Sequence, residues 1–156
     1  YAGGQIVDIA MNGMRYWFAK NLPNILTTQF PEFTATENTL VGIGCQAVYD
    51  TQYELLYFCK KDYQLRKDIP YTLSYKKANL FKNDQTGAVV ELGDPLYFND
   101  ASWTISYDPK IGQWLSYHDW HPTYVVPGKH TFLTAMNNSL WKHNHKPTSN
   151  LIIFKC

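Results

Sequence analysis

The sequence of 156 residues is long enough for one domain with its own hydrophobic core, and its net charge of +1 gives no electrostatic footprint for a nucleic acid. No apolar run approaches the length of a membrane span or of a signal-peptide core, so we expect no membrane insertion. The three cysteines, Cys45, Cys59 and Cys156, are spaced too widely for a disulfide framework or a zinc ribbon, and we expect buried free thiols.

An amphipathic helix is predicted over residues 6–22. Its apolar side chains recur at steps of three and four residues, and polar side chains occupy the rest of the helix surface. The apolar positions are Ile6, Ala10, Met14, Trp17, Phe18 and Leu22. Pro23 should end the helix, because proline disfavours the helical conformation in the residue before it. Gly13 makes the helix less stable than alanine would, by about 1 kcal/mol.

The next segment, residues 21–38, contains two prolines and four threonines and is predicted to form an extended connection. From residue 39 onward the pattern changes to short apolar runs separated by turn residues, and 16% of the chain is aromatic, which favours strands. We therefore divide the chain into a helix with a linker, residues 1–38, and a β-rich domain, residues 39–156. We also expect the chain to be part of a longer polypeptide.

Four β-hairpins and a closing strand are predicted in the β-rich domain, because pairs of apolar runs flank short polar turns. The paired runs are residues 44–50 with 54–62, 71–75 with 87–92, 103–108 with 113–120, and 131–136 with 139–143, and the closing strand is 151–154. Residues 103–151 have the length of one propeller blade, about 40 to 50 residues. We expect a mainly β fold in which antiparallel hairpins form about two propeller-blade-like sheets, preceded by the helix.

The third hairpin contains the most distinctive stretch, WTISYDPKIGQWLSYHDWH at 103–121. Asp108 and Pro109 are typical turn residues, and Gly112 supplies the left-handed conformation that leads into the return strand. Alternation along the first strand places Trp103 and Tyr107 on one face. On the return strand, alternation places Trp114, Ser116, His118 and Trp120 on one face, and Leu115, Tyr117 and Asp119 on the other.

The most specific function that this stretch could have is metal binding, because neutral imidazole is a common ligand of zinc, copper and nickel. The candidate ligands are His118, His121, His143 and His145. Adjacent residues of an extended strand point to opposite faces, however, so His118 and Asp119 do not chelate one ion. No activated serine or cysteine accompanies the histidines. Because no ligand set is complete, we expect no metal and no other cofactor.

The aromatic, histidine and turn residues of the segment 103–144 have a characteristic spacing. They are Trp103, Ser106, Tyr107, Pro109, Trp114, Ser116, His118, Asp119, Trp120, Pro122, Phe132, Leu140, Trp141, His143 and Asn144. This spacing resembles a signature of tail-associated virion structural proteins, the muzzle or stabilization proteins, of crAss-like podovirus bacteriophages. Residues 14–33 and 55–64 resemble further segments of the same family.

This resemblance implies a structural component of the bacteriophage tail, located in the virion, that extends or seals the tail without catalysis. Its expected partners are other copies of itself and neighbouring tail proteins. The alternative is a carbohydrate-binding module of a phage tail that attaches to a host-surface glycan, because exposed aromatic rings stack on sugars. The candidate stacking residues are Trp120 and Tyr124. We expect the tryptophans Trp103, Trp114, Trp120 and Trp141 to be mostly buried, as large aromatic side chains usually are.

Overall fold

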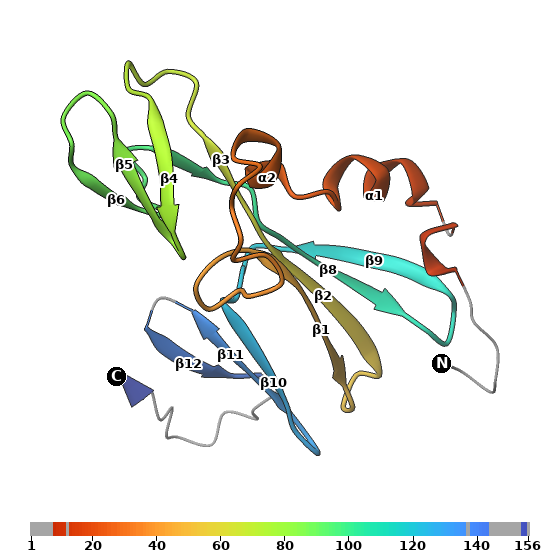
Figure 1. Ribbon diagram of the computed structural model, residues 1–156. Helices are drawn as coiled ribbons and strands as arrows, with labels where there is room; N and C mark the ends of the chain where they lie inside the picture. Colours follow the sequence, from red (N-terminus) through yellow and green to blue (C-terminus); the bar gives the residue numbers. More distant parts are fainter. Residues whose placement is uncertain (1–7, 12, 137, 144–153, 156) are drawn as a thin grey trace.

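The computed structural model describes residues 8–11, 13–136, 138–143 and 154–155. Its helices are the 3-10 helix η1 (Ile9–Met11) and the α-helices α1 (Arg15–Asn21) and α2 (Ile25–Gln29). Its strands are β1 (Gly44–Asp50), β2 (Leu55–Lys61), β3 (Tyr63–Leu65), β4 (Leu73–Lys77), β5 (Leu80–Asn83), β6 (Val89–Glu91), β7 (Phe98–Asp100), β8 (Trp103–Asp108), β9 (Gln113–His118), β10 (Tyr124–Pro127), β11 (Phe132–Met136), β12 (Ser139–Lys142) and β13 (Phe154–Lys155). The fold is mainly β, as predicted, and the paired strands run antiparallel (Figure 1).

Two four-stranded sheets dominate the fold. The first has the strand order β1-β2-β8-β9 and the second has the order β10-β11-β12-β13. A three-stranded sheet, β4-β5-β6, and the pair β3-β7 complete the described strands. The β8-β9 hairpin therefore joins the β1-β2 hairpin, and residues 103–151 do not form one blade by themselves. Residues 103–107 of β8 are all buried, because β8 pairs with β2 on one edge and with β9 on the other.

The second predicted hairpin, 71–75 with 87–92, is in fact part of the three-stranded sheet. β5 lies between β4 and β6, and Phe81 of β5 pairs with Val90 of β6. The Phe81 side chain is completely buried and packs against Phe30, with ring centroids 4.8 Å apart. This strand, LFKN, contains only two apolar residues, and a four-residue segment is too short to show alternation in the sequence.

The predicted helix over residues 6–22 is interrupted. Its first residues, 6 and 7, lie outside the described part of the chain; η1 ends at Met11, and α1 begins only at Arg15. Gly13 between them has a φ of +85°, a left-handed conformation that glycine adopts without steric cost but that no α-helix interior contains. The α-helix ends at Asn21, before Pro23, as predicted.

The expected extended connection contains a further short helix, α2, which a distant carboxylate caps. Asp62 Oδ2 accepts a hydrogen bond from the backbone N–H of Ile25 at 2.7 Å, and Asp62 Oδ1 accepts one from Leu26 at 3.3 Å. The first N–H groups of a helix have no partner within the helix, so an acceptor at this end stabilises it. Because Asp62 follows β2, no local pattern in residues 21–38 could show this cap.

The register of β8 with β9 contains a bulge. Ser106 pairs with Ser116, and the next pair is Tyr107 with Trp114, so Leu115 is the extra residue. A bulge shifts the alternation by one position, and Trp114 therefore lies on the face opposite to His118. The expectation that Trp114, Ser116 and His118 share a face was wrong for this reason.

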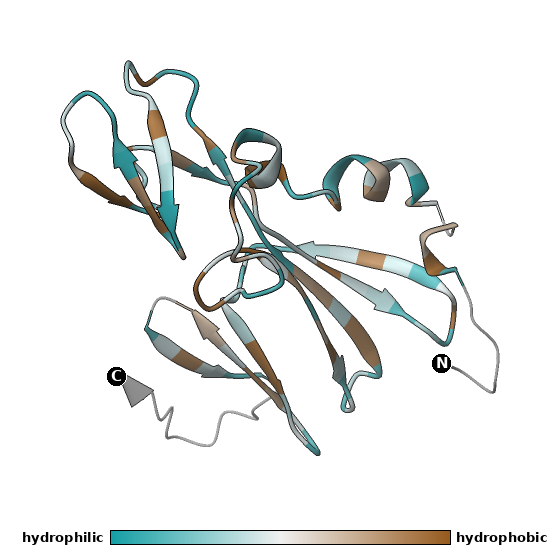
Figure 2. Cartoon of the chain, in the orientation of Figure 1, coloured by the Kyte–Doolittle hydropathy of each residue, from teal (hydrophilic) through white to brown (hydrophobic). Residues whose placement is uncertain are grey.

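The first sheet is covered on both faces. On one face α1 packs with Phe18 against Trp114 (ring centroids 4.8 Å apart) and with Trp17 against Trp103 (4.9 Å apart). The opposite face carries Val48 and Cys59, which form a buried cluster with Val125 and Phe132 of the second sheet. A separate core lies beneath the small sheets and comprises Leu26, Phe30, Phe33, Ile43, Leu73, Phe81, Val90 and Phe98. Figure 2 shows that apolar residues concentrate on β2 within the first sheet.

Candidate functional site

His118 at the end of β9 and His143 directly after β12 belong to an aromatic cluster between the two four-stranded sheets. His118 and His143 both contact Trp120, with ring centroids 5.4 and 5.0 Å from it. The His143 ring also stacks on Phe132, with centroids 4.2 Å apart and an interplanar angle of 6°. Tyr57 of β2 packs against His118 and Trp120 from the first sheet.

Each of these two histidines is hydrogen-bonded to a hydroxyl group. His118 Nε2 lies 3.0 Å from Ser106 Oγ, and His143 Nε2 lies 2.8 Å from Thr134 Oγ1. Burial lowers the pKa of both imidazoles, and the charge of Asp119 opposes this effect at His118. At His143 the carboxylate of Asp50 opposes it, while His118 lowers the pKa further. Both side chains are therefore neutral packing residues near pH 7.

The other candidate ligands do not join this pair. His121 lies on the surface beside Asp100, with Nδ1 3.4 Å from Oδ2, and His145 lies outside the described residues. Asp119 follows β9 directly, next to His118. Among the residues with defined positions, no three His, Cys, Asp or Glu side chains come together in a way that would hold a metal ion.

The turn residues of the third hairpin act as their chemistry predicts. Asp108 Oδ1 accepts hydrogen bonds from the N–H groups of Lys110 (2.8 Å) and Ile111 (3.3 Å) in the turn that contains Pro109. Gly112 has a φ of +68°, the predicted left-handed conformation. These residues build the hairpin rather than a reactive centre.

The expected burial of the large aromatic and thiol side chains is correct for some positions and wrong for others. Trp103 and Tyr107 are buried, and Trp114 and Trp120 are half-buried. Trp141 is 43% exposed, so its predicted place in the core was wrong: β12 faces solvent with this side chain. Of the two described cysteines, Cys59 is buried as expected and Cys45 is exposed, because it lies on the edge strand β1.

A glutamine side chain joins the two four-stranded sheets at their edge strands, β1 and β10. Gln46 Oε1 accepts the N–H of Val125 at 2.9 Å, and Gln46 Nε2 donates to the carbonyl oxygen of Thr123 at 3.0 Å. The same amide nitrogen donates to Thr39 Oγ1. The amide thus bonds β10 much as a backbone peptide group of a neighbouring strand would. Sequence analysis missed this residue, since a polar side chain in an alternating strand carries no distinguishing signal.

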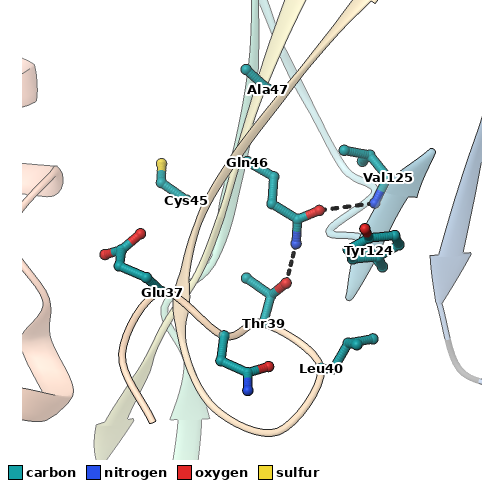
Figure 3. A pocket seen from close by; sticks show the side chains of 9 residues that line it. Glu37, Thr39, Leu40, Cys45, Gln46, Ala47, Tyr124 and Val125 are labelled. Carbon is teal, nitrogen blue, oxygen red and sulfur yellow. Dashed lines mark hydrogen bonds between the residues drawn. The ribbon is translucent and has the colours of Figure 1, made fainter. Parts of the chain in front are cut away.

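A pocket of about 300 Å³ opens beside this join (Figure 3). It is lined by Glu37, Asn38, Thr39, Leu40, Cys45, Gln46, Ala47, Tyr124 and Val125. In Figure 3 the side chains of Thr39, Leu40 and Tyr124 lie on one side of the β1 ribbon, while Glu37 and Cys45 lie on the other. Tyr124, a predicted stacking residue, is 44% exposed here, whereas Trp120 is half-buried and packs in the aromatic cluster.

Comparisons of this chain with protein-family models, with curated proteins and with solved structures find no match. None of the helices in the described part of the chain combines the length and the apolar character that a bilayer crossing requires.

Proposed function

We propose that this chain is a structural module of a bacteriophage tail that assembles with further copies of itself or with neighbouring tail proteins and carries out no catalytic step. The resemblance of residues 103–144 to tail-associated virion proteins supports this proposal. The residues that carry the resemblance support it too, because the structure uses them in packing: Trp103 and Tyr107 are buried, and His118 and His143 are bound to hydroxyl groups between the sheets.

The observation that carries the proposal is the open edge of β9. β9 is an outermost strand of its sheet and has no partner on its outer side among the described strands. Its sequence, QWLSYH, contains no Lys, Arg, Asp, Glu or Pro, which are the residues that usually protect an edge strand from pairing with another chain, and the bulge at Leu115 interrupts this edge at one position. Leu115 and Tyr117 are 48% and 57% exposed along this edge. An edge of this kind is suited to pairing within an assembly.

Sedimentation of the chain at low micromolar concentration tests the proposal. We expect concentration-dependent association, because an apolar, unpaired edge favours pairing with a second chain. Leu115→Lys places a charge on the edge and should weaken this association. Leu96→Lys is the matched control, since Leu96 is 70% exposed but precedes β7, away from the first sheet. An ideal monomer at every concentration, or association that Leu115→Lys leaves unchanged, would overturn the proposal.

A further inference from the structure

The pocket beside Gln46 is pre-formed by a rigid loop. Three backbone hydrogen bonds close the loop of residues 35–43. The N–H of Ile43 donates to the carbonyl oxygen of Ala35 (3.0 Å), and the N–H of Asn38 donates to the carbonyl oxygen of Ile43 (3.0 Å). The N–H of Gly42 donates to the carbonyl oxygen of Asn38 (2.7 Å). Gly42 allows this close packing, because a Cβ atom there would lie 2.0 Å from the carbonyl oxygen of Ala35. The volume of about 300 Å³ falls within the range of small-molecule sites.

The loop also contains a strained residue at the pocket. Glu37 has a φ of +56°, which is unusual for a residue other than glycine, asparagine or aspartate. Its backbone is held against Gly44, where an added Cβ would lie 2.9 Å from the Glu37 Cα. Backbone strain of this kind concentrates at ligand-binding segments, where the surrounding structure maintains it.

The side chains of the pocket favour a neutral ligand with many hydroxyl groups. Tyr124 presents a partly exposed ring, whose face packs well against the C–H groups of a pyranose. Asn38 supplies an amide, and the Thr39 hydroxyl accepts from Gln46 and can donate its own hydrogen. None of the residues that line the pocket is lysine or arginine. Glu37 adds a negative charge, which balances that of the nearby Lys61, whose Nζ donates to the Thr39 carbonyl oxygen at 2.7 Å, so the pocket has no excess positive charge to favour a phosphate or carboxylate ligand.

We propose that this pocket binds a neutral saccharide unit of a glycan, with Tyr124 as the stacking residue. The proposal goes beyond the assembly role and does not depend on it, because the pocket lies at β1 and β10 and the open apolar edge lies at β9. Of the two stacking residues predicted from the sequence, Trp120 and Tyr124, the proposal uses only Tyr124. Trp120 is engaged with His118 and His143 between the sheets, whereas Tyr124 lines an open pocket.

A glycan array tests this proposal with the full chain. The array contains neutral oligosaccharides of hexoses and N-acetylhexosamines, together with sialylated and uronic-acid-containing ones. We expect binding to a neutral glycan. Tyr124→Leu keeps an apolar side chain but removes the ring, and it should weaken binding about tenfold, the value of one stacking contact. Tyr124→Phe keeps the ring and should retain most of the affinity.

Tyr53→Ala is the control for loss of an exposed tyrosine, because Tyr53 is 60% exposed and lies outside the pocket. This variant should bind as the unchanged chain does. The melting temperature of each variant checks that the fold is intact. Three results would overturn the proposal: no binding to any glycan, binding that is confined to acidic glycans, or binding that Tyr124→Leu leaves unchanged. Sedimentation is measured separately, so a failure here is distinguishable from a failure of the assembly role.

Discussion

Lys60 and Asp62 form a buried ion pair at the end of β2, with Nζ 2.8 Å from Oδ2 and both side chains at most 1% exposed. Lys60 Nζ also donates to the carbonyl oxygens of Asn21 (3.0 Å) and Pro23 (2.7 Å), at the C-terminal end of α1. Asp62 caps α2, as described above. One ion pair thus holds the end of one helix and the start of the next against the first sheet.

Removal of the carboxylate should therefore be severely destabilising. Asp62→Ala leaves Lys60 as a buried, unpaired charge and removes the cap of α2, so we expect a loss of about 3 to 5 kcal/mol in the free energy of unfolding. Denaturant titration measures this loss. Asp68→Ala is the control: Asp68 pairs with Arg66 on the surface, and its replacement should leave the unfolding midpoint nearly unchanged. A loss below about 1 kcal/mol for Asp62→Ala would contradict the prediction.

The two tryptophans at opposite ends of the resembling segment should differ in their contribution to stability. Trp103 is buried against Trp17, and its Nε1 donates to the Asn21 carbonyl at 3.1 Å. Trp103→Ala should cost about 3 to 5 kcal/mol, as truncations of large buried aromatic residues do. Trp141→Ala should cost less than about 1 kcal/mol, because Trp141 is 43% exposed. Equal losses in denaturant titrations of the two variants would show that exposure is not the deciding factor.

The two partly buried histidines, His118 and His143, make the free energy of unfolding depend on pH. Burial lowers the pKa of His118 and His143 below the ordinary value of 6.5, although Asp50 and Asp119 oppose this shift. The unfolded chain therefore takes up protons at a higher pH than the folded chain, and the free energy of unfolding falls as the pH drops through 6.5. Denaturation midpoints measured from about pH 7.5 to about pH 5 should show this decrease.

A double variant is the matched test of this pH dependence. His118→Gln with His143→Gln keeps a polar side chain at each position but removes both titrating groups. The decrease in the denaturation midpoint on acidification should become smaller. A slope identical to that of the unchanged chain would assign the pH dependence to other groups.

The two described cysteines should differ in reactivity. Burial raises the pKa of Cys59 to about 12, whereas Cys45, whose pKa is also raised by desolvation, is exposed on the edge strand β1. With iodoacetamide near neutral pH, Cys45 should be alkylated in the folded chain and Cys59 should react only after unfolding. Peptide mapping by mass spectrometry distinguishes the two sites. Alkylation of Cys59 at the rate of Cys45 in the folded chain would contradict its burial.

Local chemistry predicts much of this fold. The turn at Asp108 and Gly112 and the end of α1 before Pro23 follow from residues that are adjacent in the sequence. Features that depend on residues far apart in the sequence could not be predicted from local sequence patterns. The pairing of β2 with β8 joins segments about fifty residues apart, as Phe58 opposite Ile105 shows, and strand alternation does not identify the partner of a strand.

In the candidate sites, too, some features follow from the local sequence and others depend on distant residues. Alternation argues against chelation by His118 with its neighbour, which stays a prediction, and the aromatic character of Tyr124 marks it as a stacking candidate in the sequence itself. The stacking of His143 on Phe132 arises from a contact between a strand and the residue after another strand, which spacing alone does not reveal. The bulge at Leu115 likewise follows from the register of two strands rather than from either strand's sequence.

The amide of Gln46 has a consequence for how the two sheets align. Because its oxygen bonds the N–H of Val125 and its nitrogen bonds the carbonyl of Thr123, it matches one position along β10 and no other. If β10 moved by one residue, the Gln46 amide would face backbone groups that point away from β1. Cys45 and Ala47, the residues beside Gln46, have no side-chain amide that could replace it. Gln46 therefore sets the alignment of β1 with β10, two strands of different sheets that share no backbone ladder.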